Sequence, residues 1–553
     1  MTRWSLGAWL GAGLAVTAIT AGALRVRAEA SPDPSRIIIV TGGEASAPVP
    51  TLNEGPQASV ANTDISDQLF LHLADLGPTL ITSGDRAFEP RLARSWTRRD
   101  SVTLVFDLDP RARWQDGAPV TSRDVVFTFT RARDPALAPN LARLLRHIVS
   151  VTADGDRRVV IRYSHPYGEQ LYDAVFHVAP LPAHLLAGLP PESLARAPFV
   201  RAPVGSGPYR WVRQVPGQFI ELESNPQFFL GAPAIHHVFY RLASDAQARL
   251  NMLLGGEADV MDNIPPPRSN VGRVAATPNL RVVPFPSNIV GFLLFNQRDP
   301  RDPNRPHPIL SELDVRRAII LALDRRAMVR ATFGSAAEVP FGPTSPLLWI
   351  RHGAPEPARP NLTDARRLLA KHGWADHDGD GTLDRGGVPL TLTILLTVTS
   401  AVRQELAQQV QEQLRQLGIH VELERVEFSL YNERRTSGRF DLDFASTSQD
   451  PSPTGLSQGW SCGGGTNVAK YCDPVVDSLM DAASVATSHV AEAWQAVLRR
   501  IESDAPAVFM YAPTLFAAVD RRFGNVRIRP ESFWLSLREW TVGGNPPARP
   551  AGY

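Results

Sequence analysis

The stretch LTLTILLTVTSAVRQELAQQVQEQLRQLGIHVELE, residues 390–424, decides the fold class. Its first part, Leu390 to Val398, is apolar and β-branched, which is typical of a buried strand. A helical pattern follows, with apolar residues on one face at Val402, Leu406, Val410, Leu414 and Leu417. Gly418 is expected to end this helix. Apolar and polar residues then alternate from Ile419 to Glu424, as in a strand with one buried face. A strand, a helix and a strand predict a parallel pair with a right-handed crossover, and therefore an α/β protein.

Other segments extend this mixed organisation along the chain. Arg36 to Val40 is a short apolar run that predicts a first buried strand, and Val102 to Leu108 predicts another. Thr121 precedes Asp124 by three positions, which indicates a helix start with a capping box. Three Pro- and Gly-rich segments are interpreted as surface connections, and no internal repeat is found: 264–269, 299–308 and 340–360.

Length and charge restrict the class of protein. With 553 residues, at least two packed units are expected. Hydrophobic residues make up 43% and charged residues 20%, as in soluble globular proteins. The formal net charge is +1, so no overall field attracts polyanions, and nucleic acid is not an expected partner.

The N-terminus predicts export. Arg3 precedes an apolar stretch from Leu6 to Leu24, and small residues follow at Ala28 and Ala30, which predicts a signal peptide over residues 1–30. An uncleaved membrane anchor is the alternative, because the stretch is nearly long enough to span a bilayer. No cysteine lies near the cleavage site. A periplasmic protein that is not a lipoprotein is therefore expected.

The only two cysteines, Cys462 and Cys472, lie in the Gly-rich stretch SCGGGTNVAKYC. Exported proteins meet an oxidising compartment, so we expect the two residues to form a disulfide. Two free thiols and half a metal site are the alternatives. A zinc centre lacks ligands here, since no histidine or further cysteine is nearby.

Common catalytic and metal-binding patterns do not occur. The sequence contains no GxSxG, HExxH, GxxxxGK[ST] or CxxC motif, so no catalytic residue is proposed and an enzyme is not expected. His236 and His237 are adjacent, and on a strand they point to opposite faces, which disfavours a shared metal. No metal or other cofactor is expected.

The segment DHDGDGTLDRGG, residues 376–387, resembles a calcium loop in its spacing. Gly387, however, stands where the bidentate Glu of such a loop belongs. A polar turn before the strand at Leu390 is the favoured interpretation, and calcium binding by Asp376 to Asp384 is left open.

Several separated stretches together resemble one family, the peptide-, dipeptide- and nickel-type solute-binding proteins of ABC transporters. ARWQDGAPVTSRDVVFTF, from Ala112, is similar to the family pattern W-x-D-G-x-P-(V/L)-T-A-x-D-V. The other matching stretches follow in the family's order: RLARSW (91), PVGSGPYRW (203), NPQFF (225), ARLNMLLGGEADVMD (248), FNQ (295), LDVRRAIILALDR (313) and ARRLLAKHGW (365). They span nearly all of the chain after the signal segment.

The resemblance implies a two-lobed α/β periplasmic-binding-protein fold, type II, with an extra inserted subdomain and a hinge. Lobe I is expected to comprise 31–72, an inserted subdomain 73–203, 204–285 and 505–553. Lobe II is expected over 286–504, with chain crossings near Phe285 and Asp504. Ligand binding between the lobes would shift an open–closed equilibrium.

The resemblance also implies binding residues. FDLDFASTSQDPSP, from Phe440, is similar to the family's strand-to-loop motif ending in W-x-x-D, whose aspartate pairs with the α-ammonium of a peptide; Asp450 matches that aspartate. An Asx-turn before Pro451 is the structural alternative. Thr447 replaces the family's Trp, which puts the usual dipeptide or oligopeptide preference in doubt, and Ser448 lies beside it.

Further candidates align with segments that line the family's cleft. Ser59, within 57–61, matches the extended segment that pairs with the backbone of a peptide ligand. Ser287, Asn288 and Phe292 match the stretch after the hinge, although each is also compatible with a structural role.

The expected function is therefore capture of a peptide-like ligand and its delivery to an ABC permease and ATPase, by a monomer. Nickel chelates, opines and oligosaccharides remain alternative ligands. A secreted hydrolase and a ligand-sensing receptor partner remain alternative functions.

Overall fold

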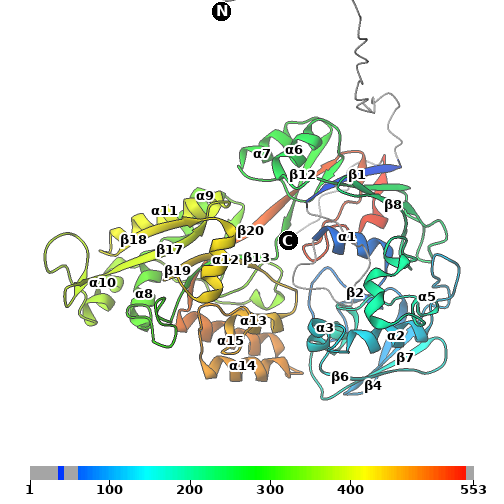
Figure 1. The fold of residues 1–553 in the computed structure, drawn as a ribbon, viewed down its shortest axis with the longest axis horizontal. Helices are drawn as coiled ribbons and strands as arrows, with labels where there is room; N and C mark the ends of the chain where they lie inside the picture. Colours follow the sequence, from blue (N-terminus) through cyan, green and yellow to red (C-terminus); the bar gives the residue numbers. More distant parts are fainter. Residues whose placement is uncertain (1–34, 43–59, 544–553) are drawn as a thin grey trace, which may run out of the picture.

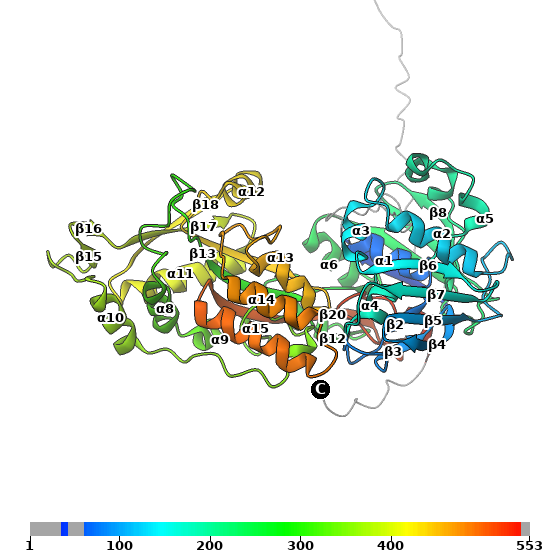
Figure 2. The ribbon, with the colours of Figure 1, turned by 90° about the horizontal axis from the view of Figure 1, so that it is seen from below.

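The computed structural model describes residues 35–42 and 60–543. Figures 1 and 2 show two lobes side by side, with β20 (Ala507–Asp520) running from one to the other. We call the body that carries β1 and β8 the first lobe and the body that carries β17 and α11 the second lobe. The predicted α/β fold with two lobes is confirmed.

The first lobe is built on strands from distant parts of the chain. β1 pairs in parallel with β10 and β11, and β10 continues antiparallel to β9. Outside the inserted segment, its helices and strands are β1 (Arg36–Thr41), α1 (Val60–Leu69), β8 (Tyr209–Val215), β9 (Phe219–Ser224), β10 (His237–Leu242), α6 (Ala246–Leu254), β11 (Val260–Met261), α7 (Ser269–Ala275), β12 (Leu280–Pro286), β21 (Phe523–Gly524) and β22 (Thr541–Val542). The predicted strand at Arg36 is confirmed as β1.

An inserted segment between α1 and β8 forms its own layer of this lobe (Figure 2). Its antiparallel sheet has the order β4-β5-β7-β6. Its elements are β2 (Ala74–Leu76), β3 (Phe88–Pro90), β4 (Ala93–Asp100), β5 (Thr103–Leu108), α2 (Ser122–Ala132), α3 (Pro139–Leu144), β6 (Ile148–Ala153), β7 (Arg158–Tyr163), α4 (Gln170–Val175) and α5 (Ala183–Leu186). The predicted capping box is confirmed, because Thr121 N donates to Asp124 Oδ2 at 2.7 Å.

The second lobe contains the predicted strand–helix–strand unit. β17 (Thr391–Thr397) and β18 (His420–Val426) are parallel, and α11 (Ala401–Arg415) connects them. The other helices and strands are β13 (Ile289–Phe295), α8 (Leu313–Ala322), α9 (Arg325–Phe333), β14 (Ala337–Glu338), α10 (Leu362–Lys371), β15 (Asp384–Arg385), β16 (Val388–Pro389), α12 (Phe428–Ser437), β19 (Leu442–Ser448), α13 (Ser457–Trp460), α14 (Pro474–Ser484) and α15 (Val490–Asp504).

The end of α11 differs slightly from the prediction. The helix ends at Arg415, and Gly418 follows a short turn in which its N–H donates to the Arg415 carbonyl. Gly418 has φ +86°, and a Cβ there would lie 2.7 Å from Leu383 Cγ. Glycine is therefore required both for the backbone conformation and for the close approach.

The lobes are connected by β12, β13 and β20 (Ala507–Asp520). The first part of β20 pairs with β13, and its last part pairs with β12 and β11. The second crossing therefore lies inside β20, whereas the sequence placed it near Asp504. Pro286 and Pro513, which lie at the crossing, have no N–H to donate to the ladder.

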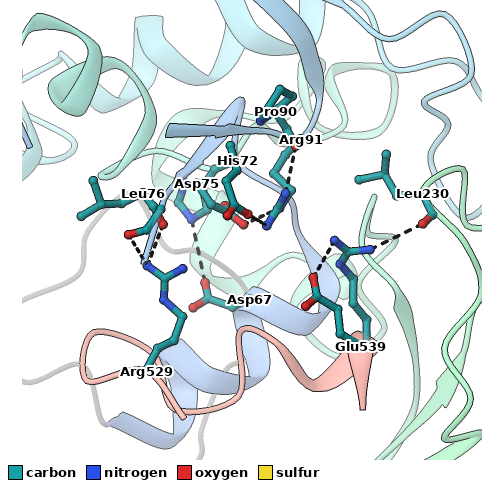
Figure 3. A network of polar contacts seen from close by, with 12 residues as sticks. Asp67, His72, Asp75, Leu76, Pro90, Arg91, Leu230, Arg529 and Glu539 are labelled. Atoms are coloured by element: carbon teal, nitrogen blue, oxygen red, sulfur yellow. Dashed lines mark hydrogen bonds and ion pairs between the residues drawn. The ribbon is translucent and has the colours of Figure 1, made fainter. Parts of the chain in front are cut away.

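The C-terminal stretch is fastened to the inserted segment by polar contacts (Figure 3). Arg529 Nη2 donates to the Leu76 carbonyl at 2.6 Å, and Arg538 pairs with Glu539 at 3.0 Å. Nearby, Arg91 Nε pairs with the buried Asp75 at 2.5 Å. Arg529 therefore holds the C-terminal stretch against the start of the insertion, while the other two pairs lie within the C-terminal stretch and within the insertion.

The two lobes have separate hydrophobic cores. The first-lobe core reaches from β1 through the inserted sheet to Trp534 and Trp540. The second-lobe cores lie around β17 and α11, and around Trp460 and Trp494. Each lobe therefore buries enough apolar surface to pack as a unit.

Candidate ligand-binding site

A pocket of about 360 Å³ opens at the end of β19 in the second lobe. β19 pairs antiparallel with β13, and its last residues become progressively more exposed where the strand leaves the sheet. The walls come from β13, β19, the loop after β19, α13 and the segment beyond it. The lining residues are Phe292, Leu294, Leu348, Arg435, Ser446, Thr447, Ser448, Gln449, Asp450, Ser452, Gly455, Leu456, Gln458, Gly459, Trp460, Thr466, Asn467 and Val468.

Asp450 is the acidic residue of this pocket. Solvent reaches its side chain, yet burial among the surrounding walls raises the pKa of its carboxyl. Within the part of the chain that the structure describes, its carboxylate forms no ion pair and accepts no hydrogen bond. An unpaired carboxylate in a partly dehydrated pocket attracts a cation.

The cation of the pocket is already neutralised. Arg435 Nε pairs at 2.8 Å with Asp443, which is fully buried. The Tyr431 hydroxyl donates to the other oxygen of Asp443 at 2.7 Å. Asp450 therefore carries the uncompensated charge of the pocket.

One face of the pocket is apolar. Phe292 is buried and packs edge-to-face on Trp460, with ring centroids 5.5 Å apart. Leu294, Leu348 and Val468 extend this face. Although Thr447 stands where the resemblance places Trp, Trp460 supplies an aromatic wall from a different element.

The inserted segment of the first lobe reaches the same region. Tyr172 of α4 is buried. Its burial is the main cause that raises the pKa of its hydroxyl, and the charge of Asp450 is the second. Ser452, which lines the pocket, donates to Glu169 at the start of α4. Residues of both lobes therefore surround the loop that carries Asp450.

The structure gathers some of the sequence candidates and separates others. Asp450, Thr447, Ser448 and Phe292 line one pocket. Ser287 is buried, and its hydroxyl accepts a hydrogen bond from Ile289 N at 3.2 Å. The backbone carbonyl of Asn288 accepts a hydrogen bond from Gln449 N at 2.8 Å. These last two lie outside the pocket lining, and their proposed ligand contacts stay predictions.

Two further predictions concern residues that lie outside 35–42 and 60–543. Ser59 and the N-terminal segment 1–30 lie outside the described residues. Both predictions therefore stand as they were made from the sequence.

Cys462 and Cys472 are bridged, with sulfur atoms 2.14 Å apart. The loop between them contributes Thr466, Asn467 and Val468 to the pocket. Asn467 also holds the loop, because its side-chain amide donates to the Tyr471 carbonyl at 2.6 Å. The bridge therefore fixes one wall of the pocket.

The calcium-like segment is an exposed turn. The carboxylates of Asp376, Asp378 and Asp380 lie near one another, and each accepts hydrogen bonds from backbone N–H groups of the turn. Asp384 instead faces His377, at 3.1 Å. These bonds explain the aspartates as turn-forming residues, and calcium binding stays an open prediction.

Sequence reasoning missed several lining residues, among them Trp460, Gln449 and Ser452. Gln449 and Ser452 flank the Asp450–Pro451 turn, so their nearness to the motif was a usable signal. The signal for Trp460 was weaker, namely its position just before the Gly-rich loop between the cysteines.

Comparison with known proteins gives one consistent family. The family model described as bacterial extracellular solute-binding proteins, family 5 Middle, matches residues 87–467. The oligopeptide-binding protein AppA of Bacillus subtilis is 26% identical over 492 residues, which cover 87% of each chain. The probable di/tripeptide-binding protein 5 of Pseudomonas aeruginosa is 26% identical over 486 residues, 81% of this chain and 86% of that protein.

Solved structures agree in fold. The structure of Bacillus subtilis AppA in complex with a nonapeptide matches with a TM-score of 0.72 and 25% identity, over 92% of this chain and 99% of that one. NikZ from Campylobacter jejuni, in complex with Ni(L-His), matches with a TM-score of 0.74 and 18% identity over the same shares.

Proposed function

The chain belongs to family 5 of the bacterial extracellular solute-binding proteins, and from this premise we propose that it captures a peptide or peptide-like ligand for an ABC importer. The ligand binds between the lobes and is passed on unaltered. The observation that carries this proposal is the unpaired Asp450 carboxylate in a pocket whose Arg435 is already neutralised. Relatives named as peptide-binding proteins support the same ligand class.

In the proposed complex, the α-ammonium group of the ligand pairs with Asp450. A charge-assisted hydrogen bond of this kind is among the stronger ones, and the surrounding walls limit the competition from water. Phe292 and Trp460 contact an apolar side chain of the ligand, while Thr447, Ser448 and Gln449 offer hydrogen bonds. Binding favours the closed arrangement of the lobes over the open one.

The test is the binding of alanine tripeptide, with a free or an acetylated amino terminus, to the wild type and to Asp450→Asn. Removal of the charge should weaken binding of the free-amine peptide by about 1.5–3 kcal/mol, the contribution of a hydrogen bond to a charged group. Isothermal titration calorimetry measures this difference. Asp378→Asn, the same chemical change at an exposed turn outside the pocket, is the matched control and should bind the peptide as the wild type does.

Acetylated tripeptide should bind weakly to wild type and variant alike. Equal affinity of wild type and Asp450→Asn for the free-amine peptide would remove Asp450 from the site. A panel that adds a nickel–histidine chelate, an opine and an oligosaccharide tests the alternative ligands through the rise in melting temperature.

The proposal includes the cellular setting. Among the described residues, no helix is both long and apolar enough to cross a bilayer. We place the chain in the periplasm after cleavage of residues 1–30, without a lipid anchor, as a monomer that docks on a permease and ATPase. Mass spectrometry of the exported protein measures the cleavage, and recovery of the unaltered ligand separates binding from hydrolysis.

A further inference from the structure

A buried carboxyl joins the two lobes beside the pocket. Glu169 lies at the start of α4 in the first lobe and is 5% exposed. Its Oε2 accepts a hydrogen bond of 2.6 Å from the Ser452 hydroxyl of the second lobe. Its Oε1 accepts another from the hydroxyl of Thr82, a buried residue of its own lobe.

A second hydrogen bond crosses between the lobes at the same place. Trp349, in the second lobe, donates from Nε1 to Thr82 Oγ1 at 3.0 Å. The polar chain therefore begins in the second lobe, passes through Thr82 and Glu169 in the first, and returns to Ser452 in the second. We call these four residues the clasp.

The backbones also approach closely here. A Cβ added to Gly168 would lie 2.6 Å from Ser83 Oγ and 3.1 Å from the carbonyl oxygen of Ala486, which follows α14 in the second lobe. Glycine next to Glu169 therefore lets the two lobes approach closely, because a Cβ there would crowd the Ala486 carbonyl.

The clasp shares a loop with the candidate ligand contact. Ser452 follows Asp450 by two residues and lines the same pocket. Its hydroxyl oxygen is held from its own lobe, 3.2 Å from Thr454 N and 2.6 Å from Thr454 Oγ1. These contacts orient the serine hydroxyl within the loop that carries Asp450.

We propose that Glu169 is a positioning residue for ligand binding, which couples the seating of a ligand on Asp450 to closure of the lobes through the Ser452 hydroxyl. This inference rests on the proposed function, because it takes the Asp450 loop as the ligand contact.

The coupling follows from the burial of the Glu169 carboxyl and its need for hydrogen-bond donors. A buried carboxyl without partners is unfavourable, so the closed arrangement requires Ser452 and Thr82 to be in place. Burial raises the pKa of Glu169 and the hydroxyl donors act against that shift, as expected of a carboxyl that depends on them. A ligand that orders the Asp450 loop presents Ser452 to Glu169, and therefore binds the closed form better than the open one.

Nitroxide labels on Arg99→Cys and Glu422→Cys, two exposed positions on different lobes, measure closure by the distance between them. With alanine tripeptide, the wild type should shift to the shorter distance. Glu169→Ala and Ser452→Ala should keep most of the longer distance and raise the Kd at least about tenfold, the effect of one lost hydrogen bond to a charged acceptor. Glu169→Gln, which keeps an acceptor oxygen, should restore part of the closure.

Ser478→Ala is the matched control, because that hydroxyl bonds only within α14. It should close as the wild type does. Closure and affinity of Glu169→Ala and Ser452→Ala equal to those of wild type would overturn the coupling while leaving the proposed function intact. If the tripeptide does not bind the wild type, the ligand assignment fails, and the ligand-free distances decide the clasp: Ser452→Ala must be more open than the wild type, and equal distances overturn the inference.

Discussion

At the scale of single residues, a local sequence motif predicts the place of some residues of the candidate site but not of others. The place of Asp450 after a strand was predictable because a strand-to-loop motif surrounds it, and its ligand contact stays a prediction. Glu169 was not, since it meets Ser452 across 283 positions of sequence and no local pattern marks it. Ser287 aligned with a cleft segment, yet its hydroxyl satisfies the backbone of its own turn.

A half-buried acid near the clasp, Asp173 of α4, makes stability depend on pH. Burial raises the pKa of Asp173 to about 8, while the Tyr167 hydroxyl, 2.6 Å away, partly opposes that shift. The folded form keeps its proton between about pH 4 and 8, where the unfolded chain ionises, so this group makes stability fall as pH rises through that window. Asp173→Asn should therefore flatten the fall in melting temperature between pH 5 and 8.

Differential scanning fluorimetry across that range measures the slope. Asp378→Asn, a change at an exposed loop position, should leave the slope as in the wild type. Parallel curves for Asp173→Asn and wild type would contradict the assignment.

At the scale of elements, hydrophobic periodicity and capping residues predicted helices and strands correctly. The β17–α11–β18 unit and the start of α2 followed from the spacing of apolar residues and from one Thr–Asp pair. The wall at Trp460 was less predictable, because α13 is a single short turn without periodicity and its place depends on the bridged loop after it.

The disulfide is expected to stabilise both the second lobe and the pocket. Cys462→Ser with Cys472→Ser should lower the free energy of unfolding by about 2–4 kcal/mol, because the open loop gains entropy in the unfolded chain. Urea denaturation measures this loss. The variant should also bind alanine tripeptide more weakly, since Asn467 and Val468 lie between the cysteines and line the pocket. Reduction of the wild type should reproduce both effects, and unchanged stability after reduction would show that the bridge contributes little.

At the scale of the whole molecule, the two-lobed plan came from the order of separated motifs, since no local pattern reports how lobes are connected. The crossing inside β20 was missed for the same reason. A continuous apolar strand gives no sign of the residue at which its pairing partners change from one lobe to the other.

Separate cores predict separate unfolding transitions. Trp540 is 1% exposed in the first-lobe core, and its ring lies 5.9 Å from that of Trp534. Trp540→Ala should remove about 3–5 kcal/mol from that lobe and lower only its calorimetric transition. Trp494→Ala, the equivalent loss in the second-lobe core, should lower only the other transition. One transition that both variants shift equally would mean that the lobes unfold as a unit.

The course of β20 limits how the molecule moves. A flexible linker would let the two lobes reorient in any direction. Here a single strand, β20, pairs with β13 in the second lobe and with β11 and β12 in the first, and the change of partners falls next to Pro513. We therefore expect the lobes to rotate about an axis near Pro286 and Pro513, so that the same two surfaces meet at each closure.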